Sequence, residues 1–318
     1  MYNDIRLEKG LYNLSGKSFT AALEELDPSG NYCGTPLENL DAYERQLKRF
    51  NIRISGDQCD RVEKFFDTTE SAVLFPEFVT RSIRKGFDEA VLSGICAAKT
   101  VCGSSQYLGC VLDDTAEYTT VGQSETLSAS TVRESGGVTV LSKYGRLINA
   151  SYEAVRQQRI DVFGIILRSI GMKLAAAVIK KAVEVLVTGA PQIKTSNLTY
   201  ADLAKLYGEF QHFGLNTLIV SPETAATIVA MDELSDISAD ESGKIILPFG
   251  AELVKTGAAA DNTIIGIDRD FALEFITSSD LVMETDKLID RQLDQITVSI
   301  TCGFRKITPD AVKVLIAE

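Results

Sequence analysis

The chain has 318 residues, of which 45% are hydrophobic and 24% are charged, and its formal net charge at pH 7 is -12. A chain of this length can bury a sizeable core and has room for two subdomains. The acidic balance argues against a basic surface that binds nucleic acid, because duplex binding needs clustered Lys and Arg to neutralise phosphates. No amino-terminal charged segment is followed by an apolar one, so we expect the protein to be made and to stay in a cytoplasm.

Residues 1–70 are polar, and turn residues break them into short pieces. We predict a short helix over residues 19–26, followed by a break at Asp27 and Pro28. A second predicted helix, over residues 37–50, has an apolar stripe with few partners in its own segment. Either this helix docks on its own domain, or it is an arm that lies across a neighbouring subunit. The stripe consists of Leu37, Leu40, Tyr43, Leu47 and Phe50.

The composition becomes more apolar after Glu70. Pro76 suits the first turn of a helix, and Gly86 is predicted to end that helix. A basic trio near this end is interpreted as a solvated helix end or as partners of acids across an interface, in preference to a phosphate site. The trio consists of Arg81, Arg84 and Lys85.

Residues 113–137 are acidic and rich in Ser and Thr, with no basic residue before Arg133. Strand-like runs flank the polar stretch at residues 118–121 and 138–141, and the second continues to residue 148. We predict a long hairpin that has too few apolar side chains for a core of its own. Such a hairpin should project from the body and rest on a partner.

The longest predicted element is a helix over residues 161–187, which would span about 40 Å. Its apolar residues follow a three-and-four spacing that predicts a stripe on one face, and Gly189 and Pro191 follow its end. The stripe consists of Phe163, Ile166, Leu167, Ile170, Leu174, Val178, Val185 and Leu186. Charged residues such as Arg168 and Lys173 interrupt the apolar run, which argues against a membrane span. The helix is longer than a compact domain needs. It is either a core helix of an ordinary enzyme or the strut of a flat, tiled subunit.

After this helix, helical and strand-like segments alternate without a regular βαβ repeat, which favours an α+β fold. The predicted helices cover residues 198–207 and the run that begins at Pro222. The predicted strands cover residues 217–220, 253–254, 263–267, 273–276, 281–284, 296–302 and 312–316.

Motifs for catalysis and metal binding are scarce. Nucleophile-elbow, Walker and dinucleotide motifs are absent from the sequence. The single histidine, His212, is interpreted as a capping or surface residue at a helix end. Residues 236–243 partly imitate a calcium loop but lack its glycine at the sixth position, and Leu247 replaces the glutamate at the twelfth. A cluster of carboxylates near the end of the chain could bind a metal or act in acid–base catalysis, but positions on the polar face of a strand or helix explain it equally well. These are Asp280, Glu284, Asp286, Asp290 and Asp294.

The cysteines give no sign of a metal or redox site. No CxxC pair is present, and no cysteine has a histidine partner at ligand spacing, so we predict neither a zinc site nor a disulfide framework. We interpret the thiols as reduced and mostly packed, and we expect no enzyme activity and no cofactor. The cysteines are Cys33, Cys59, Cys96, Cys102, Cys110 and Cys302.

In their order and spacing, six segments between residues 69 and 316 resemble the major capsid proteins of tailed bacteriophages, of the Hong Kong ninety-seven type. They read TESAVLFPEFVTRSIRKG, SKYGRLINASYEAVRQQRIDVFGIILRSIGMKLAAAVIKKAVEVLVTG, TLIVSPETAATIVAMDE, PFGAELVKT, NTIIGIDRDFALEFI and ITCGFRKITPDAVKVL. The resemblance implies an α+β fold with an amino-terminal arm, an E-loop hairpin, a P domain with a long spine helix, and an A domain. By position, these are the arm (1–70), first P-domain part (71–109), E-loop (110–147), spine helix (148–189), A domain (190–267), returning P-domain strands (268–304) and a C-terminal strand assigned to the A domain (305–318).

The resemblance also implies a function: self-assembly into hexamers and pentamers of an icosahedral phage or prophage shell. Such a shell encloses double-stranded DNA without sequence-specific contact, has portal and scaffolding proteins as partners, and does not involve a membrane. We expect the protein in the virion, after assembly in the bacterial host cytoplasm. Some relatives cross-link through an E-loop lysine; residues 113–137 contain none, which predicts a non-covalent shell. The expected inter-subunit contacts are Leu37, Leu40, Tyr43, Leu47, Phe50, Arg81, Arg84, Lys85, Asp113, Asp114, Glu117, Glu125, Arg133 and Glu134.

Two alternatives stay open. An encapsulin nanocompartment shares the architecture but encloses a cargo enzyme. A cytoplasmic hydrolase that uses the carboxylates between Asp280 and Asp294 belongs to a different class.

Overall fold

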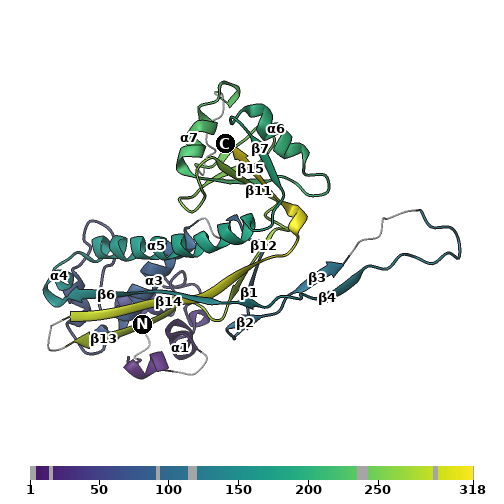
Figure 1. Cartoon of the computed structure of the whole chain (residues 1–318). Coiled ribbons are helices and arrows are strands. Elements are labelled where there is room, and N and C mark those ends of the chain that lie inside the picture. Colours follow the sequence, from purple (N-terminus) through teal and green to yellow (C-terminus); the bar gives the residue numbers. More distant parts are fainter. Residues whose placement is uncertain are drawn as a thin grey trace. The chain divides into compact units, whose positions relative to one another are not determined.

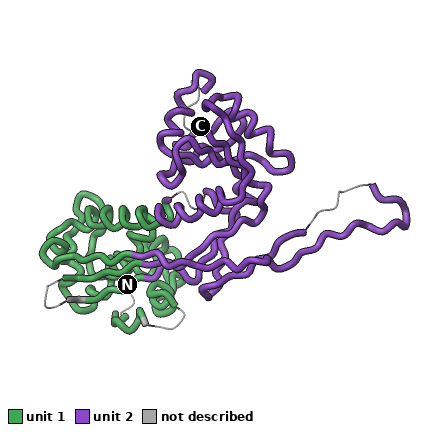
Figure 2. The backbone as a smooth tube through the Cα atoms, viewed as in Figure 1, with its two compact units in different colours: residues 1–89, 146–174, 283–298 green, residues 90–145, 175–282, 299–318 purple. Residues whose placement is uncertain are grey.

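A computed structural model describes residues 5–13, 17–90, 94–113, 120–234, 243–288 and 293–317. The chain forms two compact units whose segments interleave along the sequence (Figure 2). Unit 1 consists of residues 1–89, 146–174 and 283–298, and unit 2 of residues 90–145, 175–282 and 299–318. Figure 1 shows the helices and strands.

Three helices of the amino-terminal segment belong to unit 1. The predicted first helix is confirmed as α1 (Phe19–Leu26), where the side chain of Ser18 accepts a hydrogen bond from the Ala21 amide. The second helix, α2 (Ala42–Arg49), is shorter than predicted. It begins after Asp41 because Asp41 and Glu44 form a reciprocal capping box, which fixes the first turn there. The third helix is α3 (Leu74–Asp88).

The prediction that Gly86 ends a helix is wrong, because α3 continues to Asp88. Gly86 instead allows a close approach of α5 (Ile160–Val187): a Cβ atom at this position would overlap the backbone carbonyl of Arg168. Gly171 of α5 is its counterpart, since a Cβ atom there would overlap the carbonyl of Ile83. Two glycines therefore set the closest contact between these helices.

Aromatic side chains fill the space around this contact. The rings of Phe75 and Phe78 stack on Phe163 of α5, with centroids 6.2 and 6.5 Å apart. Phe65, which is fully buried, packs against Phe78 at 5.6 Å. The core of unit 1 therefore joins α3, α5 and a short turn before α3.

The long helix is confirmed as α5, but its buried face differs from the predicted stripe. Leu167, Leu174 and Val178 are buried, whereas Ile166 is 49% exposed. By length and composition α5 is apolar enough to cross a membrane, contrary to our interpretation of its charged residues. The core helices of globular proteins can be equally long and apolar. Because α5 packs on α3, we interpret it as such a core helix.

A five-stranded sheet has the order β1-β12-β14-β13, with β6 also paired to β14. In unit 2, β1 (Ala98–Val101) runs parallel to β12 (Leu273–Thr277), which pairs antiparallel with β14 (Leu293–Lys306). Buried and half-buried residues alternate along most of β14, as expected for a strand with one packed face. The remaining strands are β13 (Val282–Leu288) and β6 (Ser142–Ser151).

A six-stranded mixed sheet lies in unit 2, with the order β7-β15-β11-β8-β10-β9. All residues of the central strands β8 and β11 are buried, and a cluster of Leu, Ile, Val and Ala side chains packs on the sheet. The helices and strands here are α6 (Tyr200–Gly208), α7 (Pro222–Val229), β7 (Gln192–Thr195), β8 (Thr217–Val220), β9 (Ile245–Ile246), β10 (Glu252–Lys255), β11 (Thr263–Ile267) and β15 (Val312–Ala317). The mixture of helices and strands confirms the predicted α+β class.

The predicted hairpin is present. Its second strand-like run is confirmed by β5 (Thr139–Val140) and β6, but its first strand-like run is not confirmed. Residues 120–121 are not in a strand, and residues 118–119 lie outside the described part of the chain. The ladder is instead formed by β3 (Cys110–Asp113) with β4 (Thr131–Glu134), and by β2 (Gln106–Tyr107) with β5 (Thr139–Val140). We call residues 105–141 the hairpin.

Short helices connect these elements. They are α4 (Tyr152–Arg156) and the 3₁₀ turns Lys9–Asn13, Ser29–Tyr32, Val62–Phe66, Ser71–Val73, Asp232–Leu234 and Pro309–Ala311.

Candidate functional site

The described residues contain no group of three or more His, Cys, Asp or Glu side chains placed to hold a metal ion. His212 is exposed in the turn after α6. Asp290 and most of the loop that imitates a calcium site lie outside the described residues. Within the described part of the chain, no metal site is therefore available to the hydrolase alternative.

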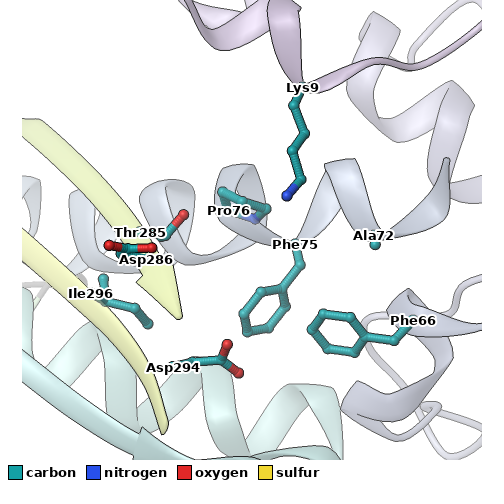
Figure 3. A pocket seen from close by; sticks show the side chains of 9 residues that line it. All are labelled: Lys9, Phe66, Ala72, Phe75, Pro76, Thr285, Asp286, Asp294 and Ile296. Carbon is teal, nitrogen blue, oxygen red and sulfur yellow. The ribbon is translucent and has the colours of Figure 1, made fainter. Parts of the chain in front are cut away.

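Two of the candidate carboxylates, Asp286 and Asp294, line a cavity of about 140 Å³ in unit 1. Figure 3 shows the Lys9 amine and the Asp294 carboxylate on opposite sides of this cavity, with the Phe75 ring between them and the Phe66 ring beside Phe75. The lining also includes the basic side chain of Lys9 and the apolar rings of Phe66 and Phe75. The cavity therefore differs from the site of a hard metal ion, which is lined by oxygen ligands.

The hairpin presents two chemically different faces. Leu112 of β3 is directly opposite Val132 of β4, so both lie on one face, where they are 61% and 68% exposed. Asp113 and Arg133 lie on the other face and form an ion pair, with 3.2 Å between Oδ2 and Nε. An exposed cross-strand apolar pair is costly in water, and a protein partner would remove that cost.

The other predicted hairpin residues have local or undetermined roles. Glu125 closes a turn by accepting a hydrogen bond from the Gly122 amide at 2.8 Å. Glu134 is exposed at the end of β4, while Asp114 and Glu117 lie outside the described residues.

A second exposed apolar surface lies on α5, opposite its buried face. Val162, Ile165, Ile166 and Met172 are 43–65% exposed and follow helical spacing. Sequence reasoning found the helix but assigned Ile166 to the buried stripe. A single sequence cannot distinguish a face that packs within the chain from one that packs on another chain.

The predicted arm stripe is largely occupied within the chain. Tyr43 and Leu47 are 1% and 3% exposed, and the Tyr43 hydroxyl donates to the Leu74 carbonyl at 3.3 Å. Both side chains are therefore buried within the subunit, as expected if this helix docks on its own domain, and their contact with another subunit stays a prediction. Leu37, Leu40 and Phe50 are half-buried.

The basic trio separates in the structure. Arg81 pairs with Asp41 at 2.6 Å and with Glu77 at 2.9 Å, and its guanidinium lies over the Tyr43 ring. Burial opposes the charge of Arg81, but the hydrogen bonds to Glu77 and Asp41 outweigh it and raise the pKa of the guanidinium. Arg81 therefore joins α2 to α3 within the subunit. Arg84 and Lys85 are exposed.

Sequence reasoning missed a buried ion pair at the root of the hairpin, next to the five-stranded sheet. Glu274 of β12 accepts hydrogen bonds from Arg305 of β14 at 2.9 and 3.1 Å. Burial opposes ionisation of Glu274, but hydrogen bonds from Thr100, Arg305 and Tyr107 outweigh it and hold the pKa of the carboxyl below its ordinary value. The sequence feature that could have revealed this pair is Glu274, a charged residue between the apolar residues Leu273 and Phe275 of a predicted strand.

Residues 137–298, slightly more than half of the chain, match the family model described as phage capsid protein. No curated protein matches the sequence.

Among solved structures, the chain is similar to the virus-like particle from Pyrococcus furiosus at 13% identity and a TM-score of 0.54, over 75% of this chain and 96% of that one. It is similar to the capsid of a native GTA particle at 14% identity and a TM-score of 0.54, over 73% and 90%. The holo-SrpI encapsulin complex from Synechococcus elongatus PCC 7942 matches at 13% identity and a TM-score of 0.53, over 71% and 86%. At these identities the likeness shows the fold.

Proposed function

The chain belongs to the phage capsid protein family, and from this premise we propose that it is the major head protein of a phage or prophage, which assembles into hexamers and pentamers of an icosahedral shell around double-stranded DNA. The observation that carries this proposal is the exposed Leu112–Val132 face of the hairpin. A two-stranded ribbon with no core of its own is marginal in water, so a second subunit is the natural surface for this face.

The elements receive family roles within this proposal. The long helix α5 is the spine of the P domain, and the hairpin is the E-loop. The six-stranded sheet with α6 and α7 is the A domain, which would surround the capsomer axis. The exposed apolar face of α5 supplies a further surface for contacts between identical subunits. Closed symmetry lets each copy use the same two surfaces, so many modest contacts act together.

The enclosed DNA would be held without a sequence-specific grip. The net charge of -12 disfavours tight phosphate binding, and Arg81, one of the basic residues considered for phosphate, is engaged within the subunit. Portal and scaffolding proteins are the further partners in this proposal, with the finished shell in the virion and its assembly in the host cytoplasm.

A double substitution on the hairpin tests the proposal. Leu112→Asp with Val132→Asp should leave the melting temperature of the free subunit within about 2 °C of wild type, because both side chains are exposed. Shell yield, counted by electron microscopy, should fall at least tenfold, since burial of the two apolar side chains is lost and two carboxylates would have to be desolvated. Leu112→Val with Val132→Ile is the matched control and should assemble. Shells in wild-type yield from the Asp variant would contradict the proposal.

An encapsulin-type nanocompartment is the second candidate, favoured by the fold it shares with the encapsulin complex of Synechococcus elongatus. The two candidates differ in content. Shells isolated from the producing cells would contain nuclease-protected DNA in the first case and a stoichiometric cargo enzyme in the second. Neighbouring terminase and portal genes would agree with the first, and a neighbouring ferritin-like or peroxidase gene with the second.

A further inference from the structure

Four strands meet around one carboxylate at the root of the hairpin. Glu274 of β12 is 5% exposed. Besides the Arg305 guanidinium of β14, it accepts hydrogen bonds from the Thr100 hydroxyl of β1 at 2.6 Å and from the Tyr107 hydroxyl of β2 at 3.0 Å. Tyr107 belongs to the hairpin, so the carboxylate bonds both the sheet and the hairpin.

Arg305 extends the connection one strand further. Its Nη1 donates to the carbonyl of Cys110, the first residue of β3, at 2.7 Å, while Nε and Nη2 bond Glu274. Gly109 lies directly against this guanidinium, since a Cβ atom there would overlap it. The planar guanidinium thus bonds the buried Glu274 on one side and the backbone of β3, the outgoing strand of the hairpin, on the other. A lysine ammonium lacks this forked geometry and is poorly suited to bridge the two.

The returning strand is anchored on the same β14. Leu141, which is 6% exposed, packs against Gly303, where a Cβ atom would lie 2.7 Å from its Cδ2. The Ser135 amide donates to the Gly109 carbonyl at 2.7 Å and so joins the two hairpin strands next to Arg305. The outgoing strand is held by polar contacts and the returning strand by apolar packing.

We propose that Arg305 and Glu274 form a clamp that sets the direction of the hairpin in the free subunit, and so positions its apolar face for a second copy of this chain. The inference deepens the proposed function. A ribbon without a core is directed only by its root, and a small change of angle there is amplified along its length. Fixing that direction before association lowers the ordering cost of each contact.

Arg305 differs from an ordinary buried ion-pair residue because it bonds both Glu274 in the sheet and the backbone of the hairpin. Buried ion pairs contribute little to net stability on average, because desolvation offsets their attraction. Here the guanidinium also binds Cys110, whose side of the hairpin has exposed side chains and no core. Loss of that single bond should loosen the hairpin and leave the sheet intact.

Two substitutions test the clamp in the full-length chain before assembly. Arg305→Lys retains a positive charge near Glu274 but loses the fork. Gly109→Ala keeps both charged side chains of the pair and adds a methyl group that overlaps the Arg305 guanidinium, so the guanidinium must move away from the strand. The control is Arg269→Lys, which alters a more exposed ion pair with Glu252 (3.1 Å) in the same unit.

The readout is amide hydrogen exchange, mapped by mass spectrometry. We expect both variants to speed exchange at residues 106–112 and 132–140 at least tenfold, with β12 and β14 unchanged, and the control to match wild type. Exchange at the hairpin within twofold of wild type in both variants would overturn the clamp, as would equal acceleration in β12 and β14. Because exchange is measured on the free chain, this result does not depend on whether shells form; failure of the wild-type chain to assemble would count against the proposed function alone.

Discussion

Gly86 and Gly171 show how much of the packing in unit 1 depends on single atoms. Each glycine faces a backbone carbonyl of the partner helix, so an added methyl group cannot be accommodated by a side-chain rotation. Separating the helices would also disturb the stacked rings of Phe75 and Phe163.

We predict that Gly171→Ala lowers the free energy of unfolding by about 1–3 kcal/mol, despite the better helix propensity of alanine. Chemical denaturation of the unassembled chain measures this. Gly164→Ala is the matched control on the same helix, because its Cβ would make an ordinary 3.4 Å contact with Phe78. That variant should gain about 0.5–1 kcal/mol. Equal effects from the two substitutions would refute the close-approach explanation.

Arg45 is the second residue on which local stability depends. Its side chain is fully buried, and its Nε lies 2.8 Å from Asp27 Oδ2. Its guanidinium also lies over the Tyr32 ring, so Arg45 connects α2 to the segment that contains Asp27 and Tyr32. Removing one partner leaves a buried charge, so Asp27→Ala should cost about 3–5 kcal/mol. The exposed pair Lys17–Glu25 is the comparison, and Lys17→Ala should cost less than about 1 kcal/mol. Thermal unfolding that ranks the two variants equally would contradict this difference.

At the level of elements, the sequence predicts best those with a regular apolar period or a clear cap. The long helix, α1, β8 and β11 have bounds close to those expected, because periodic burial and local hydrogen bonds act in the same direction. Helix α2 starts later than expected because its capping box outweighs the apolar spacing of Leu37 and Leu40. The apolar stripe was found, but the sequence left open whether it docks on its own domain or on a neighbouring subunit, and Tyr43 and Leu47 are buried within the chain.

Short strands and the hairpin register were harder to predict for a physical reason. β1, β2 and β7 contain two to four residues and owe their conformation to neighbouring strands that are distant in sequence. The side chains of β4 are all exposed, so no burial pattern marks its register. The Arg305–Glu274 pair joins residues 31 positions apart and then contacts Cys110, which no local motif reveals.

The clamp at the hairpin root should respond to acid. The pKa of Glu274 is held below its ordinary value, so the stabilisation from its ionised form is fully present above that value of 4.5 and is lost as pH falls through the lower pKa of the folded state. The groups facing this carboxylate are Arg305, Tyr107 and Thr100.

We predict that the hairpin strands lose hydrogen-exchange protection as pH falls below the ordinary glutamate pKa of 4.5, after correction for intrinsic exchange rates. Glu274→Gln should show reduced protection already at pH 7 and little further change on acidification. A wild-type profile that stays flat down to the pH at which β12 and β14 themselves lose protection would contradict the role of this carboxylate.

At the scale of the whole molecule, the sequence of the hairpin bears on the chemistry of the shell. Residues 113–137 contain no lysine, so this part of the hairpin offers no amine for an amide cross-link, and Lys143 lies beyond it in β6, which pairs with β14. We predict that mature shells boiled in SDS migrate as a single band near the chain mass of 34.6 kDa. A ladder of covalent oligomers that persists after reduction would show this prediction to be wrong.

The central claim is that identical copies of this chain close into a shell through exposed apolar surfaces that a free subunit leaves uncovered. The most direct measurement is electron microscopy of the purified chain, alone and with a co-expressed scaffolding protein, with particle mass measured by light scattering. The account predicts closed shells or ring-shaped capsomers. A stable monomer under both conditions would contradict it.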